Sequence, residues 1–132
     1  MDPKLEVQNK VLEYGGATVL INNNDFIVPI KEKGKLFDPI DVVTVGGYDY
    51  DSNFNSYDFC CNNSNMRLCT GLSYNKDNEL WSWHSWCVDE NNKIYECTPI
   101  IREGYYGAVL NEMELELFSS KLSEKNSIKK HL

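Results

Sequence analysis

The sequence predicts an α+β fold in which an antiparallel sheet packs on a helix. Four segments between residues 69 and 110 alternate as strands do and are separated by turn residues: CTGLSY, LWSWHSWCVD, KIYECTPI and GYYGAVL. An acid-rich helical segment follows Asn111, a residue suited to an N-cap. With 132 residues, 42% of them hydrophobic, the chain has the size of one domain and can bury a core.

The N-terminal part is expected to contain a helix and short strands. Residues 4–14 predict an amphipathic helix, because Leu5 and Leu12 share a face and two glycines follow. Residues 17–21 and 26–30 are interpreted as strands, the second at an edge because Pro29 lacks a backbone donor. Residues 31–39 are expected to be a loop, and residues 41–45 a third strand.

In the second half, the polar stretch 48–57 has no usable period. A helix is predicted to begin near Cys60 or Cys61 and to lie against the sheet. The four strands after it are expected to form an antiparallel meander. Residues 111–132 are predicted to form a C-terminal helix and a tail.

Charge and hydropathy restrict the partners. The net charge of -7 and pI near 4.8 argue against a nucleic-acid surface, which needs a concentrated positive field. No apolar run approaches the roughly 18 residues of a membrane helix, and the start lacks the apolar part of a signal peptide. We therefore expect no membrane association and a reducing, cytoplasmic location with five free thiols.

A thiol nucleophile needs a stabilised thiolate, a base and a group that orients the base. A cysteine at a helix N-terminus has a lowered pKa, and its backbone N–H can help to bind an oxyanion. Cys60 is expected at that place. The two histidines are His84 and His131, and His131 lies in the predicted tail, so His84 is the candidate base.

The third member of the triad is expected from the next strand. With a three-residue loop at residues 90–92, His84 lies opposite Thr98, and Glu96 falls on the same face as a diagonal neighbour. A shift of one residue would send Glu96 to the other face. The parity of this hairpin is therefore a sharp prediction.

These residues resemble a family. The segments CCNNS, HSWCVDENNKIYECTP and YYGAV resemble small papain-like or transglutaminase-like cysteine-enzyme domains. Their pattern is a helix-starting Cys-aromatic-x-Asn-Ala, then His-Ala-Trp, an acidic residue twelve positions later, and Tyr-Phe-Gly-Val. The resemblance covers residues 59–110 and implies Cys60 as nucleophile, Asn63 as the helix asparagine, His84 as base and Glu96 as the acidic residue. It leaves residues 1–58 unmatched.

The chain departs from this pattern at two places. Cys61 stands where an aromatic residue is usual, so Cys61 is an alternative nucleophile. The segment Glu96-Cys97-Thr98-Pro99 replaces an Asp-Pro-Thr segment and keeps the carboxylate in an altered setting.

The resemblance implies a thiol-dependent hydrolase or acyl transferase that acts on an amide or acyl bond of a protein, peptide or other amide substrate. Asn53 or Asn55 could supply a second oxyanion donor. The alternative is a papain-like binding or structural module without turnover. A zinc site is disfavoured, because the cysteines lack paired C-x₂₋₄-C spacing and His84 and Cys87 point to opposite faces of a strand. We expect no metal and no cofactor.

Overall fold

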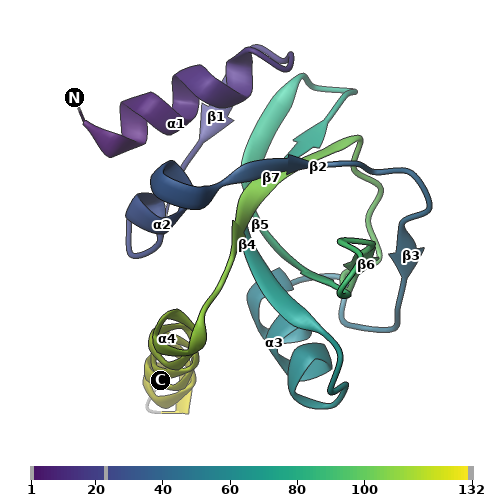
Figure 1. The fold of residues 1–132 in the computed structure, drawn as a ribbon. Coiled ribbons are helices and arrows are strands. Elements are labelled where there is room, and N and C mark those ends of the chain that lie inside the picture. Colours follow the sequence, from purple (N-terminus) through teal and green to yellow (C-terminus); the bar gives the residue numbers. More distant parts are fainter. Residues whose placement is uncertain (1, 23, 131–132) are drawn as a thin grey trace.

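The computed structural model describes residues 2–22 and 24–130, with side chains to residue 124. Within these residues the fold is a mixed α+β one (Figure 1). The elements in chain order are α1 (Pro3–Leu12), β1 (Thr18–Leu20), α2 (Ile27–Lys33), β2 (Lys35–Phe37), β3 (Val43–Thr44), α3 (Ser52–Cys61), β4 (Arg67–Asn75), β5 (Leu80–Val88), β6 (Ile94–Glu96), β7 (Gly104–Val109) and α4 (Glu112–Lys130).

The strands form one mostly antiparallel sheet in the order β2-β7-β4-β5-β6-β3. β1 runs parallel to the first residues of β5, and β3 runs parallel to β6. The sheet curls, so that β2, β6 and β3 come round on the side away from α1, α2 and α4 (Figure 1). This curl encloses a small second core.

The two cores lie on opposite faces of the sheet. The larger one packs α1, α2, α3 and α4 against the outer face. The smaller one lies inside the curl, where five strands contribute Phe37, Cys69, Trp86, Val88, Ile94 and Tyr105. Because side chains alternate along a strand, neighbouring residues of β5 enter different cores.

Two predictions for the N-terminal part are wrong. Residues 26–30 were expected to be an edge strand, but α2 begins at Ile27. Pro29 is the third residue of this helix, where no backbone donor is needed, so it does not interrupt the helix. Residues 31–39, expected to be a loop, contain the end of α2 and the strand β2.

The predicted helix start at Cys60 or Cys61 is also wrong. The helix begins at Ser52, after Asp51, whose Oδ1 accepts from the Phe54 N–H at 3.2 Å. Cys60 and Cys61 are its last two residues. The stretch that showed no period forms most of this helix.

The meander is wrong in one connection, because β7 returns to pair with β4 rather than with β6. The C-terminal helix is confirmed. Asn111 Oδ1 accepts from the Glu114 N–H and Glu114 Oε1 accepts from the Asn111 N–H, both at 2.9 Å, which is a reciprocal cap. His131 and the end of the predicted tail lie outside the described residues. In the part that is described, no helix is long and apolar enough to cross a membrane.

Candidate active site

The predicted pairing of His84 with Glu96 is confirmed. β5 and β6 pair through Cys87 with Tyr95 and through Val88 with Ile94, and this register continued would place Thr98 opposite His84. His84 Nε2 lies 2.9 Å from both carboxylate oxygens of Glu96. Both side chains therefore lie on one face of the hairpin, as its two-residue period predicts.

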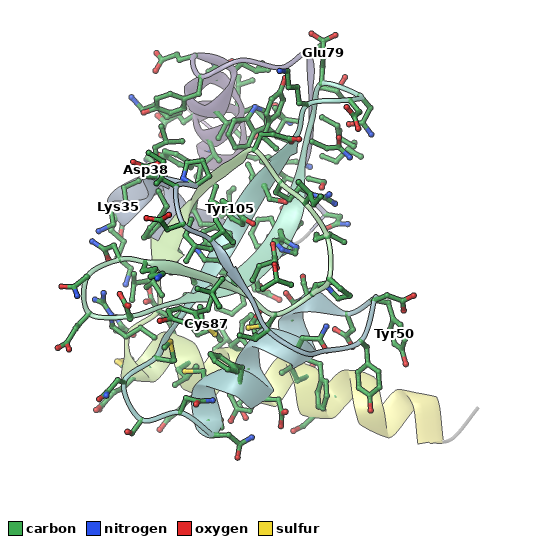
Figure 2. The ribbon with its side chains drawn as sticks, turned by 90° about the vertical axis from the view of Figure 1, so that its right-hand side faces the viewer. Lys35, Asp38, Tyr50, Glu79, Cys87 and Tyr105 are labelled. Atoms are coloured by element: carbon green, nitrogen blue, oxygen red, sulfur yellow. The ribbon has the colours of Figure 1, made fainter. Side chains whose placement is uncertain are left out.

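Glu96 is completely buried, and several hydrogen-bond donors compensate the burial of its carboxylate. Besides the imidazole, the Tyr105 hydroxyl donates to Glu96 Oε1 at 2.7 Å, and the Thr98 N–H donates to Oε2 at 3.4 Å. A buried carboxylate is tolerated only with such partners. Burial, followed by the charge of Glu96, raises the pKa of Tyr105, so that its hydroxyl stays a donor. Figure 2 shows Tyr105 in the middle of the molecule.

Two glycines lie next to His84 in the sheet. Gly71 lies opposite His84 on β4, and Gly107 lies next to Gly71 on β7. A Cβ atom at Gly107 would come within 2.8 Å of Trp86 Cη2, so the glycine lets this indole lie against the sheet. The Trp86 ring in turn stacks on His84, with centroids 6.3 Å apart and planes 20° apart. The imidazole is thus held by packing as well as by Glu96.

The second ring nitrogen of His84, Nδ1, lies in a nearly buried position. His84 is 4% exposed, and its Nδ1 makes no hydrogen bond to the described residues. It is also not one of their fully buried polar atoms without a partner, which are Ser56 Oγ, Trp83 Nε1 and Trp86 Nε1. Nδ1 is therefore without a hydrogen-bond partner among the described residues and at most slightly exposed. With Nε2–H donated to Glu96, Nδ1 carries a lone pair and can accept a proton.

Cys60 does not join this pair. Cys87 Sγ donates to the Ser56 carbonyl at 3.2 Å, so α3 lies on the face of β5 that carries Cys87, whereas His84 points to the other face. Cys60 is near the C-terminal end of α3, where the helix dipole disfavours a thiolate, and its Sγ contacts the Met66 carbonyl at 3.4 Å. Burial raises the pKa of Cys60, contrary to the predicted lowering. Cys61 is exposed at the same wrong end of the helix.

The residue at the start of α3 is Ser52, a hydroxyl side chain that the sequence analysis did not single out. On one edge β5 pairs with β1 up to Ser82 and with β6 from Cys87. Within the described part of the chain, no strand therefore pairs with residues 83–86 on that edge. The start of α3 fills this gap, and the Ser85 N–H donates to Ser52 Oγ at 3.3 Å. Backbone geometry then limits the distance from Ser52 Oγ to His84 Cα to about 6 Å.

The helix-starting motif of the cysteine-enzyme pattern also fits a start at Ser52. Counted from the true helix start, the asparagine three positions on is Asn55 and the small residue four positions on is Ser56. The same spacing fits Cys60, Asn63 and Ser64, and the presence of a cysteine favoured that register. Asp51, with φ of 58°, is an N-cap in the left-handed region, and no sequence period shows it.

The three candidate asparagines differ in their burial and in their hydrogen bonds. Asn53 Oδ1 accepts from the Ser85 hydroxyl at 2.6 Å, and its Nδ2 makes no hydrogen bond to the described residues, so it can donate to a ligand. Asn55 is buried and its Nδ2 contacts Tyr48 O, Tyr50 O and Thr98 Oγ1, which makes it a support for the preceding loop. Asn63 is exposed beyond α3 and bonds the Phe59 carbonyl.

An open polar cavity of about 680 Å³ lies in front of the start of α3. Its walls come from the loop after β1, from the first turn of α3 and from β5; they are Asn22, Asn24, Asp25, Asp51, Ser52, Asn53 and Trp83. The backbone N–H groups of Ser52 and Asn53 are the first of the helix and have no intrahelical acceptor. Ser52, its neighbouring N–H donors and the Asn53 amide thus face a space that can hold a ligand. His84 does not line this cavity.

No group of three or more His, Cys, Asp or Glu side chains within the described residues is arranged to hold a metal ion. The nearest approach of thiols is Cys87 with Cys97, whose sulfur atoms are 3.9 Å apart and buried.

Comparisons of the chain with protein-family models, with curated proteins and with solved structures find no match.

Proposed function

We propose that the chain is a hydrolase or acyl transferase for amide or acyl bonds, in which Ser52 is the nucleophile, His84 the base and Glu96 the residue that orients the base. The observation that carries this proposal is the hydrogen bond from the Ser85 N–H to Ser52 Oγ, which holds the helix start beside His84. It keeps the reaction class that the sequence suggests and replaces Cys60 by Ser52.

The reaction requires Ser52 to turn toward His84, and it requires His84 to carry a proton from Ser52 to the leaving group. No hydrogen bond joins Ser52 to His84 in this structure, and such bonds often form only with substrate. Ser52 Oγ attacks the carbonyl carbon and His84 Nδ1 takes the hydroxyl proton. The N–H groups of Ser52 and Asn53 bind the resulting oxyanion. His84 then gives the proton to the leaving amine or alkoxide, and water or an acceptor amine removes the acyl group from Ser52.

A fluorophosphonate probe tests this assignment without a known substrate, because it phosphonylates an activated serine. We expect mass spectrometry to find the label on Ser52, and none after Ser52→Ala. His84→Ala is expected to slow labelling at least about 100-fold, the lower end of a general base's contribution. Cys60→Ser is the matched control and should label at the wild-type rate. Labelling spread over other serines, or unchanged by His84→Ala in a folded variant, would contradict the proposal.

A binding module without turnover is the second candidate, and one observation favours it. His84 is 4% exposed and lies outside the polar cavity, so the His84–Glu96 pair could serve only to hold the inside of the curl together. This candidate predicts a folded wild-type protein that the probe does not label. It also predicts that His84→Ala lowers the melting temperature strongly, whereas Ser52→Ala, which removes one part-buried hydrogen bond, lowers it less.

A further inference from the structure

A second cavity, of about 400 Å³, lies at a different end of the molecule. It is formed by the segment after α1, by β2 and the residues after it, by the β4–β5 hairpin and by the start of β7; its walls are Tyr14, Leu36, Phe37, Asp38, Pro39, Tyr74, Trp81, Glu103 and Gly104. Figure 2 shows Asp38, on its rim, well separated from Tyr50, which lies beside α3. This cavity is therefore distinct from the space in front of Ser52.

Aromatic rings form most of its apolar wall, and they are fixed in place. The Tyr74 and Trp81 rings pack with centroids 5.0 Å apart, and Trp81 Nε1 donates to the Gly15 carbonyl at 3.0 Å. A Cβ at Gly104 would come within 3.1 Å of Trp81 Cη2, so the glycine lets the backbone approach the indole. Trp81 is buried as the floor, whereas the Tyr14 ring is 43% exposed at the mouth.

The charged groups of the wall are both carboxylates. Asp38 Oδ1 accepts from the Ile40 N–H at 3.0 Å, and Glu103 Oε2 accepts from the Lys76 N–H at 2.9 Å. These bonds hold each side chain and leave its second oxygen available. Among the described residues, neither carboxylate forms an ion pair with a lysine or arginine.

Two rings of the wall already contact ammonium groups of the chain. Lys10 Nζ lies 5.6 Å from the centroid of Tyr14, and Lys35 Nζ lies 5.1 Å from that of Phe37. Neither lysine lines the cavity. Among the described residues that line the interior, the charged ones are thus both acidic, and they lie beside aromatic rings, which is the combination that recognises organic cations.

We propose that this cavity binds an alkylated ammonium cation, with its methyl or methylene groups against Tyr14, Tyr74 and Trp81 and its charge toward Asp38 and Glu103. An anion would be repelled by both carboxylates, and a neutral apolar ligand would cover them without compensation. The volume suits a small molecule or one side chain. The shared chemistry is a trimethylammonium group, either of a free small molecule or of a methylated lysine in a peptide.

Isothermal titration of the full chain with choline and with its neutral isostere 3,3-dimethyl-1-butanol tests the charge requirement. We expect choline to bind about 2- to 30-fold more tightly, the range that one cation–π contact supplies. Equal binding of the two compounds, or no binding of choline, would overturn the proposal. Parallel titrations with a trimethyllysine peptide and its unmodified lysine counterpart identify the source. Tighter binding of the modified peptide than of choline assigns the ligand to a protein, and the reverse order to a small molecule.

Charge-removing variants locate the site. Asp38→Asn combined with Glu103→Gln is expected to weaken choline binding about fivefold, a modest loss because both carboxylates are exposed and screened by solvent. Glu90→Gln removes one charge in the exposed β5–β6 turn and is the matched control, expected to bind as wild type. An equal loss of choline affinity in the double variant and in Glu90→Gln would show a general charge effect and would refute the site. A thermal melt of each variant confirms that the fold is kept.

Discussion

Removal of the Glu96 carboxylate should destabilise the protein strongly, because the inside of the curl is organised around it. Glu96 is completely buried and accepts from His84 Nε2 at 2.9 Å and from the Tyr105 hydroxyl at 2.7 Å. Hydrogen bonds to a charged group contribute about 1.5–3 kcal/mol each, so Glu96→Ala should cost about 3–6 kcal/mol of unfolding free energy. Tyr105→Phe removes only one of these bonds and should cost about 1.5–3 kcal/mol.

Urea unfolding followed by tryptophan fluorescence measures both values. Tyr95→Phe is the matched control, because Tyr95 lies on the same hairpin and its hydroxyl makes no hydrogen bond to the described residues. It should change the free energy of unfolding by less than about 0.5 kcal/mol. A Glu96→Ala variant within about 1 kcal/mol of wild type would refute the reasoning, because two buried donors would then have lost their acceptor without cost.

Four further outcomes follow from the structure. Glu96→Gln should keep the fold but lower the rate of fluorophosphonate labelling at least about 100-fold, because the amide N–H₂ can turn the imidazole to the tautomer whose Nδ1 is protonated. The pKa of Tyr105 is raised in the folded state. The free energy of unfolding of the wild-type protein should therefore fall as pH rises above about 10, where the tyrosine of the unfolded chain ionises. In urea titrations, Tyr105→Phe should lack the part of this pH dependence that Tyr105 causes. Cys60 should react with limiting iodoacetamide only above the usual thiol range of about pH 8.5, as mapped by mass spectrometry, and fast labelling near pH 6 would contradict its raised pKa. A Cβ at Gly71 would come within 2.2 Å of a backbone oxygen whereas one at Gly46 meets nothing within 4 Å, so Gly71→Ala should lower the free energy of unfolding by at least about 1–3 kcal/mol, and Gly46→Ala should not.

The hairpin that carries His84 and Glu96 was predictable because strand parity is a strict rule. Once the turn at residues 90–92 was recognised, a two-residue period left only one face for each side chain, and the register of β5 with β6 agrees. The reciprocal cap at Asn111 was equally local and equally predictable.

The start of α3 was not predictable in the same way. Its residues are polar and aromatic without an apolar stripe, so tertiary packing against β5 decides that they are helical. The cap that begins it, Asp51, lies next to other turn-prone residues and carries no distinct signal. Because the true helix start lies eight residues before Cys60, local pattern places Cys60 at the helix N-terminus, where the structure has Ser52.

Pairing of β7 with β4 and the helical state of residues 27–33 depend likewise on contacts between distant segments. Pro29 argued for an edge strand, but the first turn of a helix tolerates proline equally well. Local pattern could not separate these two possibilities.

The most direct test of the central claim is the thiol pKa of Ser52→Cys, measured from the pH dependence of its iodoacetamide reaction with mass-spectrometric mapping. If Ser52 lies at a helix N-terminus within reach of His84, the new thiol should titrate below the ordinary value of about 8.5, while Cys60 in the same molecule titrates above it. His84→Gln in this background should raise the pKa of the new thiol again. A new thiol that titrates at or above about 8.5, or one whose pKa is unaffected by His84→Gln, would contradict the assignment of Ser52 and His84 to one active site.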